Sequence, residues 1–229
     1  MANMQTSETG GQEETFPLLR QTELRKCLSD VQLKELEHFC RPRMRKSGTT
    51  LFRQGEPAEA LYMVIDGSIE LRARPPGRRV YRTIELVQPT CTFGDEALFG
   101  EDTYLMSARV LEAARLLVLP RSGFERVSDE HPDIAVGILQ CSGSCLLQTI
   151  RRSAILTQSP ADVGLRQLLI ELSHRNHGVG GRLVPLRITH AQLAGVLHLS
   201  RETVSRMLAQ MANEGAVQLG RGVIRMRQS

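Results

Sequence analysis

The stretch "HLSRETVSRMLAQM", His198 to Met211, decides the fold of the C-terminal part of the chain. Ser200 is a good helix N-cap, and apolar residues recur at helical spacing after it. At about 100° per residue, three apolar side chains share one face of this helix: Val204, Leu208 and Met211. Four others share the opposite face: Glu202, Ser205, Arg206 and Ala209. We therefore expect the first face to be buried and the second to face solvent.

A second helix is predicted just before this one. It begins at Thr189, which has Gln192 at the capping-box position, and only His198 and Leu199 separate the two helices. Such a short turn makes the helices cross steeply and projects the start of the second one outward. Arg201 and the N-terminal amides suit phosphates, arginine matches the two acceptors of guanine, and glutamate accepts from the cytosine amino group. The projected face is therefore suited to DNA, whereas the simpler alternative is a capped surface helix.

The charge distribution agrees with a DNA-binding C-terminal third. Residues 160–229 hold nine arginines, no lysine and four acidic residues, so this part carries +5 while the whole chain carries +4. A basic third on a nearly neutral remainder favours a polyanion partner, and the alternative is a solvated arginine-rich surface. No run approaches the roughly 18 apolar residues of a membrane span, and the N-terminus has no apolar signal core. We expect a cytoplasmic protein without a membrane partner.

Catalytic and metal motifs are missing from the sequence. The five cysteines contain no C-x-x-C pair, the six histidines contain no H-x-x-x-H pair, and no serine, cysteine or aspartate lies in a nucleophile motif. We therefore expect neither an enzyme nor a metal site.

The chain divides into four parts by pattern. Residues 1–16 are polar and predicted to be disordered, and 17–131 are predicted to form a β-barrel of jelly-roll type from many short strands. Within it, "LYMVIDGSIELRAR" predicts a hairpin that turns at Asp66-Gly67. Residues 132–158 predict one long helix, and 159–229 predict the helices described above followed by a hairpin.

The long helix carries a narrow seam at spacings of four and three, as in coiled coils. Its members are Leu139, Gly143, Leu146, Ile150 and Ser153. A thin seam with small residues favours pairing with an identical helix, so we expect a symmetric dimer; packing on the chain's own barrel is the alternative.

Three stretches together resemble one known family. "ITHAQLAGVLHLSRETVSRMLAQMANEGAV" resembles the helix-turn-helix of Crp-Fnr transcription regulators, and "LFRQGEPAEALYMVIDGSIEL" and "TFGDEALF" resemble their cyclic-nucleotide-binding-like barrel. The likeness runs in order from about Leu24 to Met226. It implies an α+β fold: an N-terminal double-stranded β-helix (jelly-roll) sensor domain, a long dimerisation helix and a C-terminal winged helix-turn-helix domain.

The resemblance also implies partners and DNA-binding residues. The partners are double-stranded DNA with a pseudo-palindromic operator, a second copy of the chain, and RNA polymerase. The recognition-helix residues would be Arg201, Glu202 and Arg206, with Arg206 contacting guanine, and the hairpin at 220–222 would be the wing. The full predicted DNA-binding set is Thr189, Gln192, Ser200, Arg201, Glu202, Thr203, Ser205, Arg206 and Arg221.

The effector pocket departs from the cyclic-AMP-binding pattern of the family. Gly94 with Asp95 or Glu96 stands at the ribose position and Thr149 at the base position, but Met106 replaces the arginine that precedes Ser107 at the phosphate. Stranding a buried charge without its partner costs about 3 to 5 kcal/mol, so ordinary cyclic AMP binding is disfavoured. Arg109, two residues beyond Ser107, could substitute only with a shifted strand register.

Other effectors stay open at this point. Cys141 and Cys145 lie one helical turn apart and are candidates for thiol redox chemistry, or else small buried apolar residues. Cys27 and Cys40 are too few and too far apart for the family's N-terminal iron-sulphur cluster, and Cys91 has no neighbouring histidine for haem. A small molecule, or no effector, completes the alternatives. A different class of function is a ligand-binding regulatory subunit whose C-terminal domain docks on protein.

Overall fold

The computed structural model describes residues 15–75, 77, 80–174, 185–186, 188–220 and 223–226. Most of the segment predicted to be disordered, 1–16, lies outside these residues. Thr15 and Phe16 instead begin helix α1 (Thr15–Leu19), and the Phe16 amide donates to the Glu37 carboxylate at 3.2 Å. The prediction was wrong for these two residues because Leu18 and Leu19 anchor the helix in the core.

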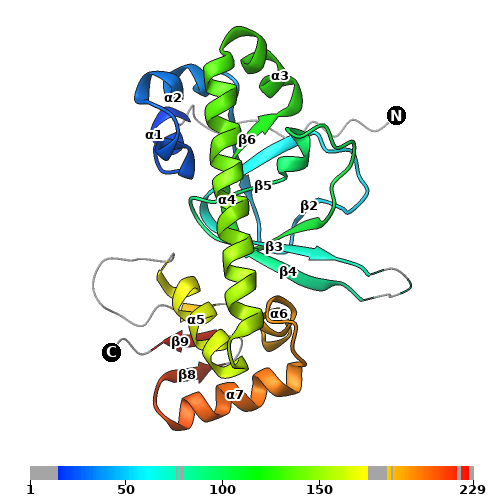
Figure 1. Cartoon of the computed structure of the whole chain (residues 1–229), viewed down its shortest axis with the longest axis vertical. Helices are drawn as coiled ribbons and strands as arrows, with labels where there is room; N and C mark the ends of the chain where they lie inside the picture. The colour runs from blue at the N-terminus through cyan, green and yellow to red at the C-terminus, as the bar shows by residue number, and fades with distance from the viewer. Residues whose placement is uncertain are drawn as a thin grey trace.

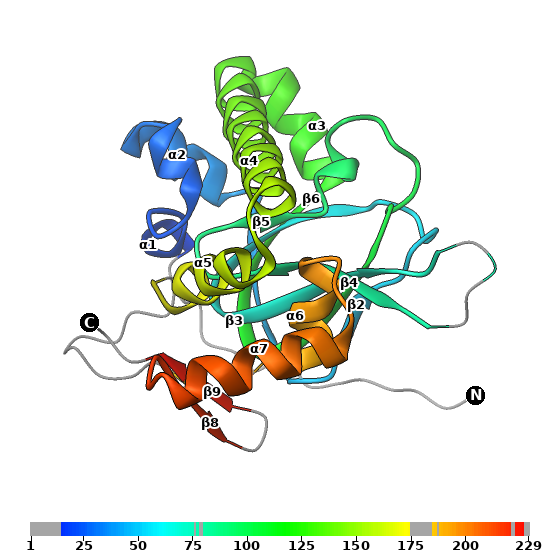
Figure 2. The same ribbon diagram turned by 60° about the horizontal axis from the view of Figure 1, so that its bottom comes forward.

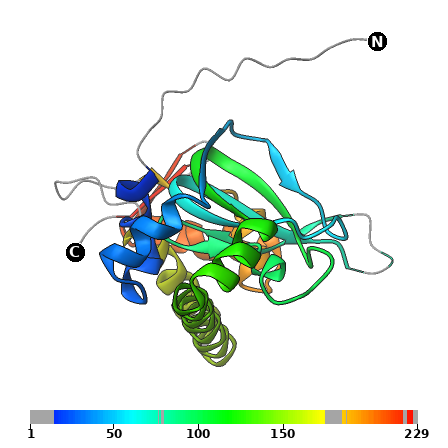
Figure 3. The same cartoon turned by 90° about the horizontal axis from the view of Figure 1, so that it is seen from above.

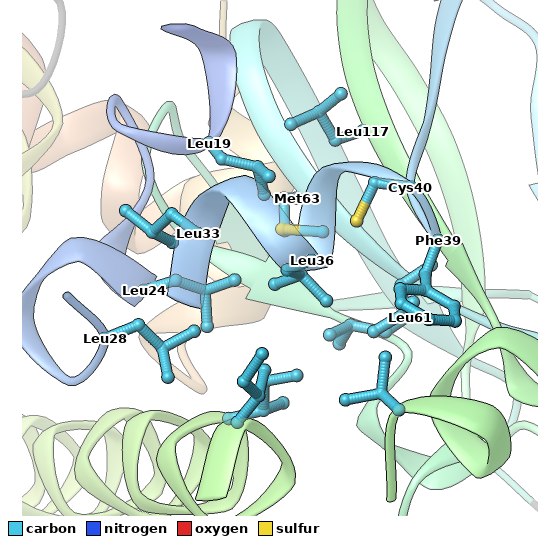
Figure 4. Close-up of a cluster of buried hydrophobic side chains, with 14 of the residues drawn as sticks. Leu19, Leu24, Leu28, Leu33, Leu36, Phe39, Cys40, Leu61, Met63 and Leu117 are labelled. Carbon is cyan, nitrogen blue, oxygen red and sulfur yellow. The ribbon is translucent and has the colours of Figure 1, made fainter. Parts of the chain in front are cut away.

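Two further short helices complete the N-terminal segment, η1 (Glu23–Lys26) and α2 (Asp30–Glu37). Ser29 caps α2 and shares a capping box with Gln32. These helices bury leucines against the barrel and a long helix, and Figure 4 shows the cluster that results. Its labelled members are Leu19, Leu24, Leu28, Leu33, Leu36, Phe39, Cys40, Leu61, Met63 and Leu117.

The N-terminal domain is an antiparallel barrel-like sheet, and its strands in the described residues are β1 (Arg41–Arg45), β2 (Thr50–Phe52), β3 (Ala60–Ala73), β4 (Arg82–Val87), β5 (Thr92–Phe93) and β6 (Ser107–Pro120). The order is β1-β6-β3-β4, with β2 paired to β6 and β5 paired to β3. The predicted jelly-roll class is consistent with this sheet.

The hairpin predicted at Asp66-Gly67 is wrong, because β3 continues through it as one strand. Gly67 has a φ of 84°, and the register against β6 shifts on both sides of it. A Cβ at Gly67 would lie 2.4 Å from the Ala113 carbonyl oxygen, so only glycine lets the strands approach this closely. The Asp-Gly signal therefore marks a bulge that bends a long strand.

A long helix connects the two halves of the molecule. After α3 (Arg121–Glu130), α4 spans Pro132–Gln158, and Figure 1 shows it running from α3 down to the C-terminal helices. Over Pro132–Arg151 the helix is apolar enough to cross a membrane by length and composition alone, with mean hydropathy 1.2 and 33% of that stretch buried. It is still not an uninterrupted apolar run, because polar residues such as Gln140, Ser142 and Ser144 lie within it, so it is weak evidence for a membrane span. In Figure 3 the barrel lies on one side of α4 and no element on the other.

The C-terminal elements are α5 (Ala161–His174), β7 (Pro185–Leu186), α6 (His190–Val196), α7 (Arg201–Asn213), β8 (Val217–Gly220) and β9 (Val223–Met226). The three strands form a sheet in the order β7-β9-β8. Figure 2 shows α7 along the base of the molecule with the β8-β9 hairpin beside it, as expected for a winged helix-turn-helix.

The C-terminal domain packs directly on the barrel through α6 and β4. A Cβ at Gly195 of α6 would lie 2.6 Å from the Thr83 carbonyl oxygen, so glycine permits this close approach. Thr83 is itself fixed, since its hydroxyl donates to the buried Glu70 carboxylate at 2.6 Å. Leu86 of β4 belongs to the same buried cluster as the core of α5, α6 and α7. The C-terminal half and the barrel therefore share part of one core.

Candidate functional site

Local backbone conformation and helix capping shape the turn between α6 and α7. His198 has a φ of 54°, and this left-handed residue ends the first helix. Ser200 caps α7, because its hydroxyl accepts from the Thr203 amide at 3.0 Å. Thr189 caps α6 and shares a capping box with Gln192. These caps fix both helix starts and hold the N-terminus of α7 at the surface.

The two faces of α7 lie as predicted from the spacing. Val204, Leu208 and Met211 are buried, whereas Arg201, Glu202, Arg206 and Ala209 are exposed. The amide of Glu202 and the Ser200 hydroxyl lower the pKa of the Glu202 carboxyl below its ordinary value, so it is ionised at neutral pH. An exposed cation-anion-cation face at a helix N-terminus offers donors and acceptors for phosphates and base edges.

Several residues predicted to contact DNA already have partners within the protein. The Ser205 hydroxyl lies 2.8 Å from Nδ1 of His190, which ties α7 to α6 and leaves Ser205 half-buried. The Thr203 hydroxyl lies 3.0 Å from that of Ser200. Ser205 therefore helps to set the crossing of the two helices, a role that spacing along one helix did not reveal. Arg221 of the predicted wing lies outside the described residues.

A pocket of about 690 Å³ lies between the barrel, η2 (Asp95–Ala97), α4 and α5. This volume suits a small-molecule ligand. Much of its wall is apolar or aromatic: Phe52, Leu71, Val87, Phe93, Phe99, Leu105, Met106 and Leu146. The sequence predicted a pocket here from the family resemblance, but contributions from η1 and α5 could not be foreseen.

The structure brings most of the predicted effector residues to this pocket. Its lining includes Gly94, Asp95, Glu96, Met106 and Thr149. Gly94 has a φ of 81° and begins η2 in the left-handed region, where glycine is favoured. The Asp95 carboxylate accepts from the Ser142 hydroxyl of α4 at 2.8 Å, so the turn after β5 is fastened to the long helix.

The predicted phosphate position is closed. Ser107 is fully buried, is absent from the pocket lining, and its hydroxyl accepts from the Gln54 amide at 2.9 Å. Arg109 also lies outside the lining; it is exposed on β6 opposite Thr50 and Glu70. Neither the serine nor the substitute arginine is therefore placed to hold a phosphate, and Met106 occupies the wall instead.

A second cavity, of about 410 Å³, lies where the two domains meet. Thr149 of α4 and Ile84 of β4 line both cavities. The second cavity is also lined by Leu197, His198 and Leu199 of the turn before α7. A group bound in the large pocket is therefore one side chain away from the element that positions the DNA-binding helix.

The two helix thiols have a third neighbour that the sequence did not connect with them. Cys141 is buried in the cluster of Figure 4, and Cys27, which follows η1, packs against the same cluster. Cys145 lines the large pocket. The hydrogen bond from Cys141 lowers the pKa of the Cys145 thiol and raises that of Cys141. In the described part of the chain, no group of three or more His, Cys, Asp or Glu could hold a metal ion.

We expect Cys145 to be alkylated by iodoacetamide at lower pH than the other described cysteines. The thiolate is the reactive form, and its stabilisation by Cys141 shifts the rise of the rate with pH to below that of an ordinary thiol. Mass spectrometry of quenched samples between pH 6 and 9.5 gives the rate at each cysteine. Cys40, whose pKa burial raises to about 12, is the internal control. A Cys145 profile that matches an unperturbed thiol would contradict this assignment.

The side chains of the predicted α4 seam are exposed to solvent in the single chain. Leu146 and Ile150 are 60% and 54% exposed, and Leu139 is 37% exposed. A Cβ at Gly143 would meet nothing within 4 Å. Ser153 is also exposed, and Gly143 and Leu146 border the large pocket. An apolar stripe that the chain's own barrel does not cover is available to a partner.

Comparisons with known proteins match both halves of the chain. A cyclic nucleotide-binding domain model matches residues 42–131, and a Crp-like helix-turn-helix domain model matches residues 165–228. The chain is 31% identical over 196 residues to the cyclic AMP receptor protein of Thermus thermophilus, covering 85% of this chain and 87% of the relative. It is 28% identical over 181 residues to a CRP-like cAMP-activated global transcriptional regulator of Mycobacterium tuberculosis, covering 77% and 80%.

A solved structure shows the same arrangement. A transcriptional regulator of the CRP/FNR family from Thermus thermophilus superposes with a TM-score of 0.64 at 28% identity, and the match covers 82% of this chain and 94% of that one. The similarity therefore extends through barrel, long helix and C-terminal domain, in the order predicted from the sequence.

Proposed function

Because the chain belongs to the Crp-Fnr family of DNA-binding transcription regulators, we propose that it binds a pseudo-palindromic operator as a homodimer through α7. The observation that carries this proposal is the exposed face of α7. It combines Arg201, Glu202 and Arg206 at a capped helix N-terminus, over a buried apolar face. Two such helices about 34 Å apart would enter successive major grooves.

The open side of α4 supports the dimer. Its apolar stripe is exposed in one chain, and a symmetric pair of α4 helices would cover it on both copies at once. The spacing of the two α7 helices then depends on how the α4 helices pair, because α5 follows directly after the end of α4 at Gln158.

The large pocket is proposed as the effector site. A ligand there would contact Thr149 of α4, which also lines the second cavity, and the η2 turn at Asp95, which is hydrogen-bonded to Ser142 of α4. It changes DNA binding only if it binds two arrangements of the domains with different affinity. The second cavity, beside the α6-α7 turn, is where a change at Thr149 would reach the position of α7.

We make further proposals about location, partners and catalysis. We place the protein in the cytoplasm, with RNA polymerase as a further partner and with no catalytic activity. The alternative, a regulatory subunit that docks on protein, is disfavoured because the exposed face of α7 carries the charged groups that suit DNA.

The operator test uses duplexes selected from random-sequence DNA by the purified protein. We expect a pseudo-palindrome with half-sites about 10 base pairs apart, centre to centre, or a multiple of this. Inserting five base pairs between the half-sites should lower affinity toward that for random DNA, about 10³-fold or more, because one α7 then faces the wrong side of the duplex. The same insertion outside the half-sites is the control. Equal affinity for selected and random DNA would favour the protein-docking alternative.

A further inference from the structure

The charge of the large pocket is opposite to what a phosphate ligand needs. Six carboxylates line it: Glu23, Glu85, Asp95, Glu96, Glu101 and Glu171. Among the described lining residues, the basic side chain is Arg151. Lys26 pairs with Glu23 at 2.5 Å just outside the lining and offsets one of the six. Glu85 and Glu171 have interactions of their own, but Asp95, Glu96 and Glu101 alone still outnumber Arg151 among the described lining residues.

Two of these carboxylates have neutral hydrogen-bond partners in the protein. Asp95 accepts from the Ser142 hydroxyl, and Glu96 accepts from the Leu105 amide at 3.1 Å. Both donors are neutral, so they orient the carboxylates without cancelling the charge. Burial and the nearby Glu96 and Glu85 raise the pKa of Asp95, which means that its anion lacks sufficient compensation from the protein.

The apolar part of the wall is aromatic beside these carboxylates. Phe52 and Phe93 line the pocket with ring centroids 6.0 Å apart. Phe99 and Leu105, also in the lining, are 56% and 59% exposed, so they add accessible apolar surface to the pocket wall. Aromatic faces next to carboxylates are the surroundings in which organic ammonium groups are held.

We propose that this pocket binds an organic cation, an ammonium group on a flat apolar body, in preference to a phosphate ester. The proposal rests on the proposed effector function of the pocket and adds the chemical class of the ligand. The apolar body would lie against the phenylalanines and Met106, and the ammonium group would lie toward Asp95 and Glu96. At the predicted phosphate position, Ser107 does not line the pocket and Met106 replaces the arginine, which agrees with this preference.

Tryptamine and indole-3-propionate provide a matched test, because they share one ring system and differ in charge. The chain contains no tryptophan, so indole fluorescence reports the ligand alone. We expect fluorescence anisotropy to show saturable binding of tryptamine at one per chain, at least about tenfold tighter than that of indole-3-propionate. No saturable binding of tryptamine, or equal or tighter binding of the anion, would overturn the proposal.

Variants of the lining test the assignment in both directions. Glu96→Gln keeps an acceptor for the Leu105 amide and removes the charge, so tryptamine should bind several-fold more weakly. Met106→Arg places a cation in the wall and should shift the preference toward indole-3-propionate. Glu125→Gln, at an exposed position on α3, should change neither affinity. Equal effects of Glu96→Gln and Glu125→Gln would show surface binding and overturn the proposal.

Operator binding is measured separately, so the two proposals can fail independently. Tryptamine binding without any change in operator affinity would support the ligand class and refute effector control through this pocket. A protein that does not select an operator would refute the proposed function, while the anisotropy comparison would still decide the charge preference.

Discussion

Replacing Leu139 and Ile150 together by aspartate is expected to make the protein monomeric and to lower its operator affinity to that for random DNA, about 10³-fold or more. Both side chains are exposed on α4, and neither lines either of the two cavities described above, so the large pocket should stay intact. In a symmetric pair, each aspartate would face its own copy or apolar side chains across the seam. Like charges buried in an apolar contact cannot be compensated there.

Analytical ultracentrifugation and DNA anisotropy measure the two effects on the same samples. Val31→Asp is the matched control, because Val31 is a 73% exposed apolar residue at the start of α2, away from the seam. Unchanged thermal unfolding would show that the chain still folds. A double variant that stays dimeric would refute the assignment of the α4 seam as the dimer interface. A monomer that keeps full operator affinity would instead refute the need for two copies.

The parts of this protein that could be predicted from sequence are those set by local spacing. The caps at Ser200 and Thr189 and the buried face of α7 each depend on neighbours within a few residues. The same holds for α4, whose bounds match the range expected from the missing internal proline. Local hydrogen bonding and helical periodicity are enough to determine these features.

The predictions that were wrong concern features that depend on segments distant in the sequence. Gly67 marks a bulge and not a turn because of Ala113 and Ala114, which follow it by more than forty positions. The Ser107 hydroxyl accepts a hydrogen bond from the backbone amide of Gln54 in the turn after β2, and the Ser205 hydroxyl contacts His190 of the preceding helix. No pattern along one strand or helix contains that information.

The net charge of the large pocket could not be predicted from the sequence either. Asp95, Glu96 and Met106 were predicted to meet there, but η1 and α5 add Glu23 and Glu171 from opposite ends of the chain. The net sign of the site therefore appears only after folding. The family resemblance located the pocket, whereas the apolar wall that Phe52, Phe93 and Met106 form beside Asp95 and Glu96 appears only after folding.

Replacing Arg206 by alanine is expected to cost about 1 to 3 kcal/mol per half-site and to relax the preference at one base pair in each. Arg206 is exposed on the same face as Glu202, one turn in from the helix N-terminus, where a side chain reaches base edges. Arg201 is the first residue of α7 and suits the phosphate backbone. Arg201→Ala should therefore weaken all sequences alike.

Titrations of the operator and its single-base variants over a range of salt concentrations separate these two roles. Loss of a phosphate contact lowers the slope of log affinity against log salt by about one per contact, whereas loss of a base contact removes discrimination between base pairs. Arg126→Ala is the matched control, since it removes the same charge from α3 in the sensor half. If Arg206→Ala weakened operator and random DNA equally, Arg206 would be a phosphate contact, and sequence recognition would have to come from Glu202 or from the shape of the DNA.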